Sequence, residues 1–252
     1  MSSSATARSP RAFWDEIFSE GHANPYSRVA MPDLNEPNLQ QALQHFGNVE
    51  GRTLIDVGCG RGSASLFFAY HGAHVISVDA SAVAIDNLAT YCTQHGIHNI
   101  TPVCCTAEEL TALDTRADFV YGAMILHHVE PFAAFVRTLR RVMKPNGRAF
   151  FWENNGRNPL LMWFRRHVVG RGWIPKFGDA HEIPLTPDEV SQLDDHFSVS
   201  VRYPELLLFR MISFYLLKGS MGRAMHALDR FFYRFPAIRR HSYRQHIYLE
   251  AS

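Results

Sequence analysis

Two carboxylates and a glycine-rich turn are the residues of this chain best suited to chemistry. Asp56 stands just before a turn that contains Gly58, Gly60 and Gly62, and Asp79 follows about 20 residues after the first glycine. Glycine allows the backbone to turn sharply after a strand and to lie against a ligand without a clash from Cβ. A carboxylate at this spacing can accept both hydroxyl protons of a ribose. The pattern predicts a binding site for a ligand that contains a nucleoside.

The spacing of the glycines separates two classes of such ligands. Dinucleotide-binding turns have the pattern G-x-G-x-x-G and hold a pyrophosphate at the helix N-terminus. Here the glycines run G-x-G-x-G, and Ser63 stands at the third dinucleotide position. Asp56 would repel a pyrophosphate, whereas it could face an ammonium group. The turn therefore disfavours NAD. The alternatives are a glycine turn without a ligand and, for Asp79, an acid that only starts the next helix.

The elements that position these residues follow from the hydrophobic pattern. From Thr53 onward, short apolar segments alternate with helical segments, which predicts right-handed β-α-β connections and a parallel sheet. The strands are apolar throughout, as burial on both faces requires. We expect strands at residues 53–57, 74–78, 99–104, 118–124 and 148–153, and helices at 63–71, from the cap Ser81 to Gly96, and at 131–143, the last ended by a turn at 144–147.

The N-terminal segment has a different pattern. Residues 1–10 are rich in Ser, Ala and Thr, which is typical of disorder. Residues 12–18 and 35–46 have helical apolar spacing, and the second helix has Asn35 near its cap and Pro37 in its first turn.

The regular alternation stops after the fifth strand. Residues 154–187 are rich in Gly, Pro, Asn and His and too long for an ordinary connection, which predicts a lid or substrate loop. Residues 205–235 are mostly helical in pattern, and residues 197–203 and 242–250 are expected as two late strands.

Four segments, in order, resemble motifs of the class I S-adenosylmethionine-dependent methyltransferases. The first is the turn at residues 56–62, and the second is Asp79 at the end of the next strand. Thr106-Ala107-Glu108 follows the third strand as the family's adenine site does. Tyr121 to Val129 is similar to the family's fourth-strand motif, which often ends in Leu-His-His-Val. The resemblance covers about residues 50–155.

This resemblance implies a fold, a cofactor and a set of binding residues. The fold is α/β: a doubly wound, Rossmann-like, seven-stranded mixed sheet with helical N-terminal and inserted C-terminal cap elements. The cofactor is S-adenosyl-L-methionine. Some quinone-pathway O-methyltransferases bind a divalent metal through two glutamates and a histidine of the fourth-strand segment, but Met124 and His127 replace the glutamates here, so no metal is expected. The implied cofactor-binding residues are Asp56, Gly58, Cys59, Gly60, Asp79, Ala80, Ala107, Glu108, Ala123 and Met124.

Three residues are candidates for proton transfer. His127 would approach the transferring methyl group. Glu153 is the first residue of a segment that resembles a family subgroup with the pattern Glu-Pro-x-Gly-x-Asn-Pro, although Asn154 stands where Pro is common. In that subgroup an acid–His segment follows downstream, and His181 lies in the corresponding segment here. A neutral histidine can accept a hydroxyl or phenol proton near neutral pH. His127, His181 and Glu153 are the catalytic candidates, and a loop-ordering or packing role is the alternative for each histidine.

These patterns divide the chain into three parts and predict a reaction. Residues 1–47 are expected as a disordered tail and N-terminal cover helices, residues 48–155 as the cofactor-binding core, and residues 156–252 as a substrate lid or helical insertion with terminal strands that complete the sheet. The expected reaction is methylation of a small or medium hydrophobic metabolite, lipid-like acceptors included, with oxygen as the favoured atom. The alternatives are N- or C-methylation and a non-catalytic S-adenosylmethionine-binding protein.

Composition limits the partners. The formal net charge is +1, which argues against a dedicated nucleic-acid binder. Arginines alternate with large apolar residues at 205–240, which suggests a peripheral membrane contact or an apolar substrate pocket. A helical cap with solvated arginines is the simpler interpretation. The four cysteines lack C-x-x-C spacing, and neither a signal-like nor a membrane-spanning run is present, so a cytoplasmic protein is expected. The oligomeric state is open.

Overall fold

The strands form one seven-stranded mixed sheet in the order β3-β2-β1-β4-β5-β7-β6, which confirms the expected doubly wound α/β fold. The computed structural model describes residues 10–19, 28–169, 183–216 and 218–251. The strands are β1 (Thr53–Val57), β2 (His74–Asp79), β3 (Ile100–Cys104), β4 (Ala117–Ala123), β5 (Met143–Asn154), β6 (Phe197–Arg202) and β7 (Arg244–Ala251). The helices are α1 (Pro10–Ser19), α2 (Pro37–Phe46), α3 (Ser63–Tyr70), α4 (Ala82–His95), α5 (Phe132–Val142), α6 (Pro159–His167), α7 (Pro187–Ser191), α8 (Leu208–Leu216), α9 (Gly222–Phe232) and α10 (Pro236–Arg239), with the 3₁₀ helices η2 (Ala107–Leu113) and η3 (Leu126–His128).

The chain forms two compact units, and the boundary between them passes through α5 and β5. The first unit contains residues 1–123, 137–149 and 251, and the second contains 124–136, 150–250 and 252.

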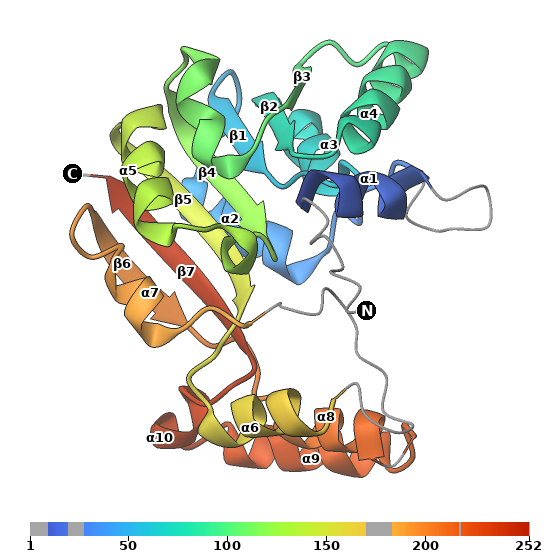
Figure 1. Ribbon diagram of the computed structural model, residues 1–252, viewed down its shortest axis with the longest axis vertical. Coiled ribbons are helices and arrows are strands. Elements are labelled where there is room, and N and C mark those ends of the chain that lie inside the picture. The colour runs from blue at the N-terminus through green and yellow to red at the C-terminus, as the bar shows by residue number, and fades with distance from the viewer. Residues whose placement is uncertain (1–9, 20–27, 170–182, 217, 252) are drawn as a thin grey trace, which may run out of the picture. The chain divides into compact units, whose positions relative to one another are not determined.

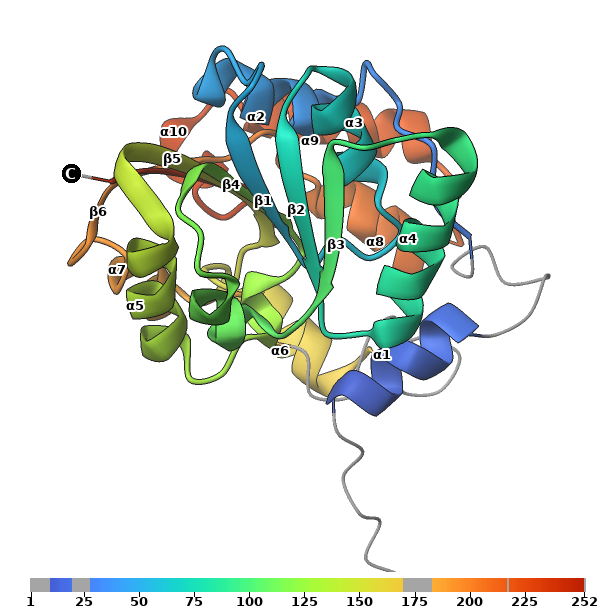
Figure 2. The same ribbon diagram turned by 90° about the horizontal axis from the view of Figure 1, so that it is seen from above.

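The first unit is built on the parallel strands β1 to β4. β1 pairs with β2 and with β4, and β2 pairs with β3, all in parallel register, so the carboxyl ends of these strands lie at one edge. α3 and α4 pack against the strands, as Figure 2 shows. An aromatic cluster fills the core beside β4: the ring centroid of Phe46 lies 4.9 Å from that of Phe119, and the ring of Phe68 lies 5.2 Å from that of Tyr121. Burial of such rings contributes about 1.5–3 kcal/mol for each side chain.

Local signals in the sequence fix the ends of α4. The Ser81 hydroxyl accepts a hydrogen bond from Ala84 N, and Gly96 closes the helix with a left-handed φ of 64°. The same hydroxyl donates to Asp15 of α1 at 2.6 Å, which anchors α1 at the start of α4. The expected cap at Ser81 and the expected helix end at Gly96 are therefore confirmed, and α1 is attached to α4 at Ser81.

The second unit contains a helical layer and the end of the sheet. The ring of Phe164 on α6 lies 6.2 Å from that of Tyr215 on α8, and α8 lies against α9 (Figure 1). Asp229 of α9 is buried, and its carboxylate accepts hydrogen bonds from Phe209 N at 2.8 Å and Arg210 N at 3.1 Å. Because these are backbone N–H groups of the first turn of α8, Asp229 acts as a cap supplied by another helix. No helix in the part of the chain that the structure describes is long and apolar enough to cross a membrane.

The structure refines one expected element boundary and contradicts another. The cap of α2 is Glu36, whose side chain accepts from Leu39 N, so Asn35 lies next to the cap and Pro37 in the first turn, as expected. The residues expected as a turn at 144–147 lie within β5, where Asn146 has a φ of 61°. A positive φ inside a strand is typical of a bulge, which has the same sequence preference as a turn.

The stretch expected as one long loop contains a helix. The Asn158 side chain accepts from Leu160 N and Leu161 N, and Pro159 occupies the first position of α6. Asn followed by Pro is a strong signal for the start of a helix. The signal was overlooked because the whole stretch was interpreted as one long loop. α7 at Pro187 was not expected either, although Thr186 and Glu189 form a capping box there. Residues 1–9 and 170–182, which include most of the expected tail and the middle of the expected lid, lie outside the described residues.

Candidate cofactor and acceptor sites

The glycine turn of the first unit is locked to the end of β2. Gly58 N and Cys59 N both donate to the Val78 carbonyl, at 2.8 and 2.9 Å. Gly62 has a φ of 74°, and a Cβ at this position would lie 2.6 Å from Leu88 Cδ1 on α4. A side chain at residue 62 would therefore be both strained and in collision, so the close approach of the turn to α4 depends on glycine.

Asp79 connects the turn with the start of α4. Its Oδ2 accepts from Gly60 N at 2.8 Å, and its Oδ1 accepts from Ser81 N at 2.9 Å. The residue is 8% exposed, and burial raises the pKa of its carboxyl although both backbone hydrogen bonds act in the opposite direction. A carboxylate has about four lone-pair sites, so two remain for hydroxyl donors such as those of a ribose.

Asp56 is buried beneath the turn at the end of a short relay of hydroxyls. Ser77 donates to Ser65 Oγ at 2.7 Å, and Ser65 donates to Asp56 Oδ2 at 2.6 Å. Burial, with a smaller contribution from the charge of Asp79, raises the pKa of Asp56 to about 7. A cation close to this carboxyl would lower its pKa and therefore increase the fraction of Asp56 that is ionised near neutral pH.

The residues after β3 form a tight helical start. Ala107 is buried at the first position of η2, and Thr106 and Glu109 cap this helix reciprocally, with Thr106 N donating to Glu109 Oε2 at 2.9 Å. Cys105 N donates to the Asp79 carbonyl at 3.1 Å, which holds the end of β3 beside the end of β2. Glu109 rather than Glu108 serves as the capping acid, so the Glu108 carboxylate is not used by the cap.

α1 contributes a side chain that sequence reasoning missed. Phe18 is buried, and its Cζ lies 3.5 Å from the position that a Cβ on Gly60 would occupy. The ring therefore covers the glycine turn at its centre. The helical apolar spacing of residues 12–18 predicted a buried face but gave no signal for what this face would cover.

The fourth strand ends at Ala123 in the first unit, and Met124 opens the second. Met124 has a φ of 57°, and its N–H donates to the Trp152 carbonyl at 2.8 Å. A left-handed conformation is uncommon for a residue other than glycine and concentrates at functional sites.

Glu153 and His127 form a buried pair directly after this bend. Glu153 Oε1 accepts from Ile125 N at 2.7 Å and from Leu126 N at 2.6 Å, and Oε2 lies 2.6 Å from His127 Nδ1. Neither side chain has any solvent exposure. Both carboxylate oxygens therefore hold the segment that follows Met124. His181 lies outside the described residues, so its expected role stays a prediction.

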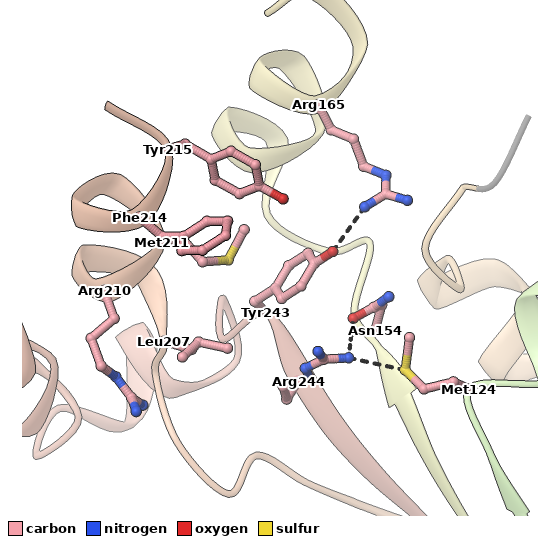
Figure 3. Close-up of a pocket in the computed structure, with 10 residues that line it drawn as sticks. All are labelled: Met124, Asn154, Arg165, Leu207, Arg210, Met211, Phe214, Tyr215, Tyr243 and Arg244. Atoms are coloured by element: carbon pink, nitrogen blue, oxygen red, sulfur yellow. Dashed lines mark hydrogen bonds between the residues drawn. The ribbon is translucent and has the colours of Figure 1, made fainter. Parts of the chain in front are cut away.

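A pocket of about 540 Å³ opens in the second unit (Figure 3). This volume is within the range of small-molecule sites. α8 supplies one side, and the ends of β5 and β7 with Met124 supply the other. The lining residues are Met124, Asn154, Arg165, Leu207, Arg210, Met211, Phe214, Tyr215, Tyr243 and Arg244. Among these residues Met124 was a predicted site residue, and Asn154 lies in the segment that resembles the Glu-Pro-x-Gly-x-Asn-Pro subgroup. Leu207, Phe214 and Tyr215 lie in the stretch at 205–240, for which an apolar substrate pocket was one interpretation.

Comparisons with known proteins identify the family. A family model described as a methyltransferase domain matches residues 55–151. The ubiquinone biosynthesis O-methyltransferase of Cereibacter sphaeroides is 34% identical over 148 residues, which cover 57% of this chain and 58% of the relative. The ubiquinone biosynthesis O-methyltransferase of Rickettsia bellii is 25% identical over 174 residues, which cover 69% of this chain and 72% of the relative. Residues 55–151 are thus a methyltransferase domain, and the chain is an S-adenosylmethionine-dependent methyltransferase.

Solved structures support the fold of this methyltransferase. The N-methyltransferase NodS from Bradyrhizobium japonicum, in complex with S-adenosylhomocysteine, aligns with a TM-score of 0.59 over 96% of this chain and 97% of its own, at 9% identity. The residues at the turn fit this cofactor, because the Asp79 carboxylate, which accepts from Gly60 N and Ser81 N, keeps lone pairs for the hydroxyls of a ribose. Within the described ranges, no group of three or more metal-ligating side chains is present.

For this methyltransferase we expect Asp56→Asn to change stability and cofactor affinity in opposite directions. The folded-state pKa of Asp56 is about 7, whereas an unfolded aspartate titrates near 3.9. The folded protein therefore holds a proton that the unfolded chain releases, and stability falls as pH rises from about 4 to about 7. Asparagine does not ionise and removes this loss, which is of the order of a few kcal/mol. Its neutral amide should lower S-adenosylhomocysteine affinity by about tenfold, because the ligand's ammonium loses a charged partner.

The measurement is the melting temperature without ligand near pH 5 and near pH 8, together with calorimetric titration of S-adenosylhomocysteine. The Asp56→Asn variant should melt above the wild type at the higher pH, with a smaller difference at the lower pH. Asp86→Asn, the same change at an exposed position of α4, is the control. A melting difference that does not depend on pH would show that Asp56 is already ionised in the folded protein.

Proposed function

We propose that this methyltransferase methylates a hydroxyl oxygen of a small or medium hydrophobic metabolite, lipid-like acceptors included. The observation that carries the proposal is the pocket of the second unit, whose lining is mainly aliphatic, aromatic and thioether side chains. Met124, which lines it, directly follows the last residue of β4 in the chain. Two relatives named for O-methylation in ubiquinone biosynthesis support the choice of oxygen and of an apolar acceptor. N- or C-methylation is the alternative outcome.

The proposed roles of the cofactor-binding residues follow from the first unit. S-adenosylmethionine supplies a methyl group that is already activated on a sulfonium. We propose that Asp79 binds the ribose hydroxyls, that Asp56 attracts the ammonium group, and that Ala107 and Glu108 hold the adenine edge. Gly58, Cys59, Gly60 and Ala80 would provide the surrounding backbone, and Ala123 and Met124 the end of the fourth strand.

We propose that Glu153 and His127 act as a positioning pair. The Glu153 carboxylate fixes two backbone N–H groups and one imidazole nitrogen, all of them immediately after Met124. Full burial of both side chains supports this role over direct contact with the acceptor. The pair would hold Met124 and the pocket wall in a fixed geometry, and such positioning accounts for much of enzymatic catalysis. His181 remains the candidate for a proton acceptor.

A membrane surface is a further proposed partner of the second unit. Large apolar side chains on α8, α9 and the turns beside α9 are exposed, among them Phe214, Met221, Phe231 and Phe235. Exposed arginines at 223, 230 and 234 accompany them. Apolar residues flanked by arginines are typical of helices that lie on anionic membranes. In a flotation experiment, phosphatidylglycerol vesicles should recover the protein and phosphatidylcholine vesicles should not. Phe231→Ser should lower the fraction recovered with phosphatidylglycerol. Equal recovery with both lipids would contradict the proposal.

The acceptor class is tested with a series of 4-alkylcatechols. Each methylene buried in an apolar pocket contributes about 0.8 kcal/mol, so kcat/KM should rise by about tenfold or more from ethylcatechol to hexylcatechol. Phe214→Ser, which makes the pocket wall more polar, should reduce this rise, whereas Phe235→Ser should leave it unchanged. If kcat/KM does not depend on chain length, the pocket does not bind the apolar part of the acceptor.

A further inference from the structure

One guanidinium of the pocket is held rigidly by aromatic rings. Arg244 Cζ lies 5.0 Å from the ring centroid of Trp152 and 5.2 Å from that of Tyr243. Its Nη1 donates to Asn154 Oδ1 at 2.5 Å and lies 2.9 Å from the sulfur of Met124, as Figure 3 shows. The orientation of the guanidinium is therefore fixed before any acceptor binds.

The charge of Arg244 has no carboxylate in contact with it among the residues that the structure describes. Both hydrogen bonds begin at Nη1, one acceptor is a neutral amide, and the other is a thioether, which is a weak acceptor. The nearest acids are used elsewhere: Glu153 binds the segment after Met124, and Glu205 pairs with Arg210. Burial lowers the pKa of Arg244, and the charges of Tyr243, Glu205 and Glu153 only partly oppose this shift.

The other arginines of the pocket differ in this respect. Arg210 pairs with Glu205 and, at 3.3 Å, with the buried carboxylate of Asp229. Arg165 Nη1 donates to the Tyr243 hydroxyl at 2.9 Å, as Figure 3 shows. The charge of Arg210 is thus neutralised by contacting carboxylates, whereas no carboxylate among the described residues contacts Arg244.

The unused donors of Arg244 match one kind of ligand. Nε and Nη2 lie on one edge of the guanidinium and can form two parallel hydrogen bonds to the two oxygens of a carboxylate. A guanidinium recognises such a planar anion better than a single hydroxyl or an amide, because both of its donors are used at once.

We propose that Arg244 binds a carboxylate of the methyl acceptor, so that the enzyme binds apolar acceptors that carry an acidic group more tightly than neutral apolar acceptors, which it also methylates. This inference rests on the proposed function, because it assigns the pocket to the acceptor. The apolar part of the acceptor lies against the α8 side chains Met211 and Phe214, and the carboxylate lies at the edge of Arg244 formed by Nε and Nη2. Arg244 is a specificity-determining residue in this arrangement.

The test is equilibrium binding of 4-hexylbenzoate and 4-hexylbenzamide in the presence of S-adenosylhomocysteine. A charge-assisted hydrogen bond contributes about 1.5–3 kcal/mol, so the wild type should bind the acid about 10- to 100-fold more tightly than the amide. Arg244→Gln should bring the two affinities within about threefold of each other, and Arg244→Lys should restore part of the preference. Arg223→Gln, an equal charge change on the exposed surface of α9, should leave the preference intact.

Each contrary result has a defined meaning. Equal affinities in the wild type, or no detectable binding of the acid, overturn the carboxylate site whether or not the variants fold. Persistence of the preference in Arg244→Gln assigns it to another residue, and tighter binding of 4-hexylphenyl phosphate than of the acid replaces a carboxylate by a phosphate. Methyl transfer to neutral alkylcatechols is measured separately: its failure contradicts the proposed function and not the anion site.

Discussion

Asp79→Ala should lower the affinity for S-adenosylhomocysteine by about 100-fold or more. The side chain accepts from Gly60 N and Ser81 N and is the proposed acceptor for both ribose hydroxyls. Hydrogen bonds to a charged group contribute about 1.5–3 kcal/mol each, and two are lost on the ligand side alone. The glycine turn also loses its connection with α4, so the empty variant should melt at a lower temperature than the wild type.

Calorimetric titration measures the affinity, and Asp86→Ala on the exposed face of α4 is the matched control. Its affinity and melting temperature should stay close to those of the wild type. Unchanged affinity in Asp79→Ala would show that the ribose binds elsewhere. A lower melting temperature with unchanged affinity would limit Asp79 to its structural hydrogen bonds.

Glu153→Gln should leave cofactor affinity within about threefold of the wild type and lower kcat by about 100-fold or more, as expected when a preorganised site is disturbed. The amide oxygen can still accept from Ile125 N and Leu126 N, so the variant should fold. The amide nitrogen is a donor, however, and would face His127 Nδ1, which must then give up its proton. The imidazole changes tautomer, and the segment after Met124 loses its charged anchor.

The measurement is kcat and KM with hexylcatechol, together with a pH profile. A loss confined to kcat, with KM nearly unchanged, supports a positioning role for the pair. Glu130→Gln, an exposed position close to this segment in the chain, should behave as the wild type. Wild-type turnover in Glu153→Gln would exclude any role of the pair in catalysis, and a large loss of cofactor affinity would assign Glu153 to the cofactor site instead.

The parallel core could be predicted from the sequence because its signals are local. Apolar strands, the cap at Ser81 and the stop at Gly96 each act within a few residues, and the structure reproduces them. The pairing of Asp79 with the glycine turn also follows from spacing, because adjacent parallel strands bring their carboxyl ends together. The turn predicted at 144–147 failed because a bulge and a turn favour the same residues.

The composition of residues 205–240 suggested an apolar substrate pocket as one interpretation, but the arrangement of the pocket could not be predicted, because its residues interact over long sequence separations. Asp229 resembles any surface acid on an amphipathic helix, yet it is buried as the cap of α8. Arg244 stands at the start of a strand, and only the packing of Trp152 and Tyr243 against it makes it a fixed donor. Phe18 is similar: its helical face was predictable, whereas its contact with Gly60 depends on the anchoring of α1 at Ser81.

The central claim is O-methylation of an apolar acceptor, and one experiment tests it directly. The enzyme is incubated with S-adenosylmethionine labelled with ¹³C at the methyl group and an equimolar mixture of 4-hexylcatechol and 4-hexylaniline, and the products are identified by NMR. We predict a labelled aryl methyl ether, formed in equal amount with S-adenosylhomocysteine. Label on nitrogen or on a ring carbon, or tight binding of S-adenosylhomocysteine without transfer to either acceptor, would contradict the proposed function.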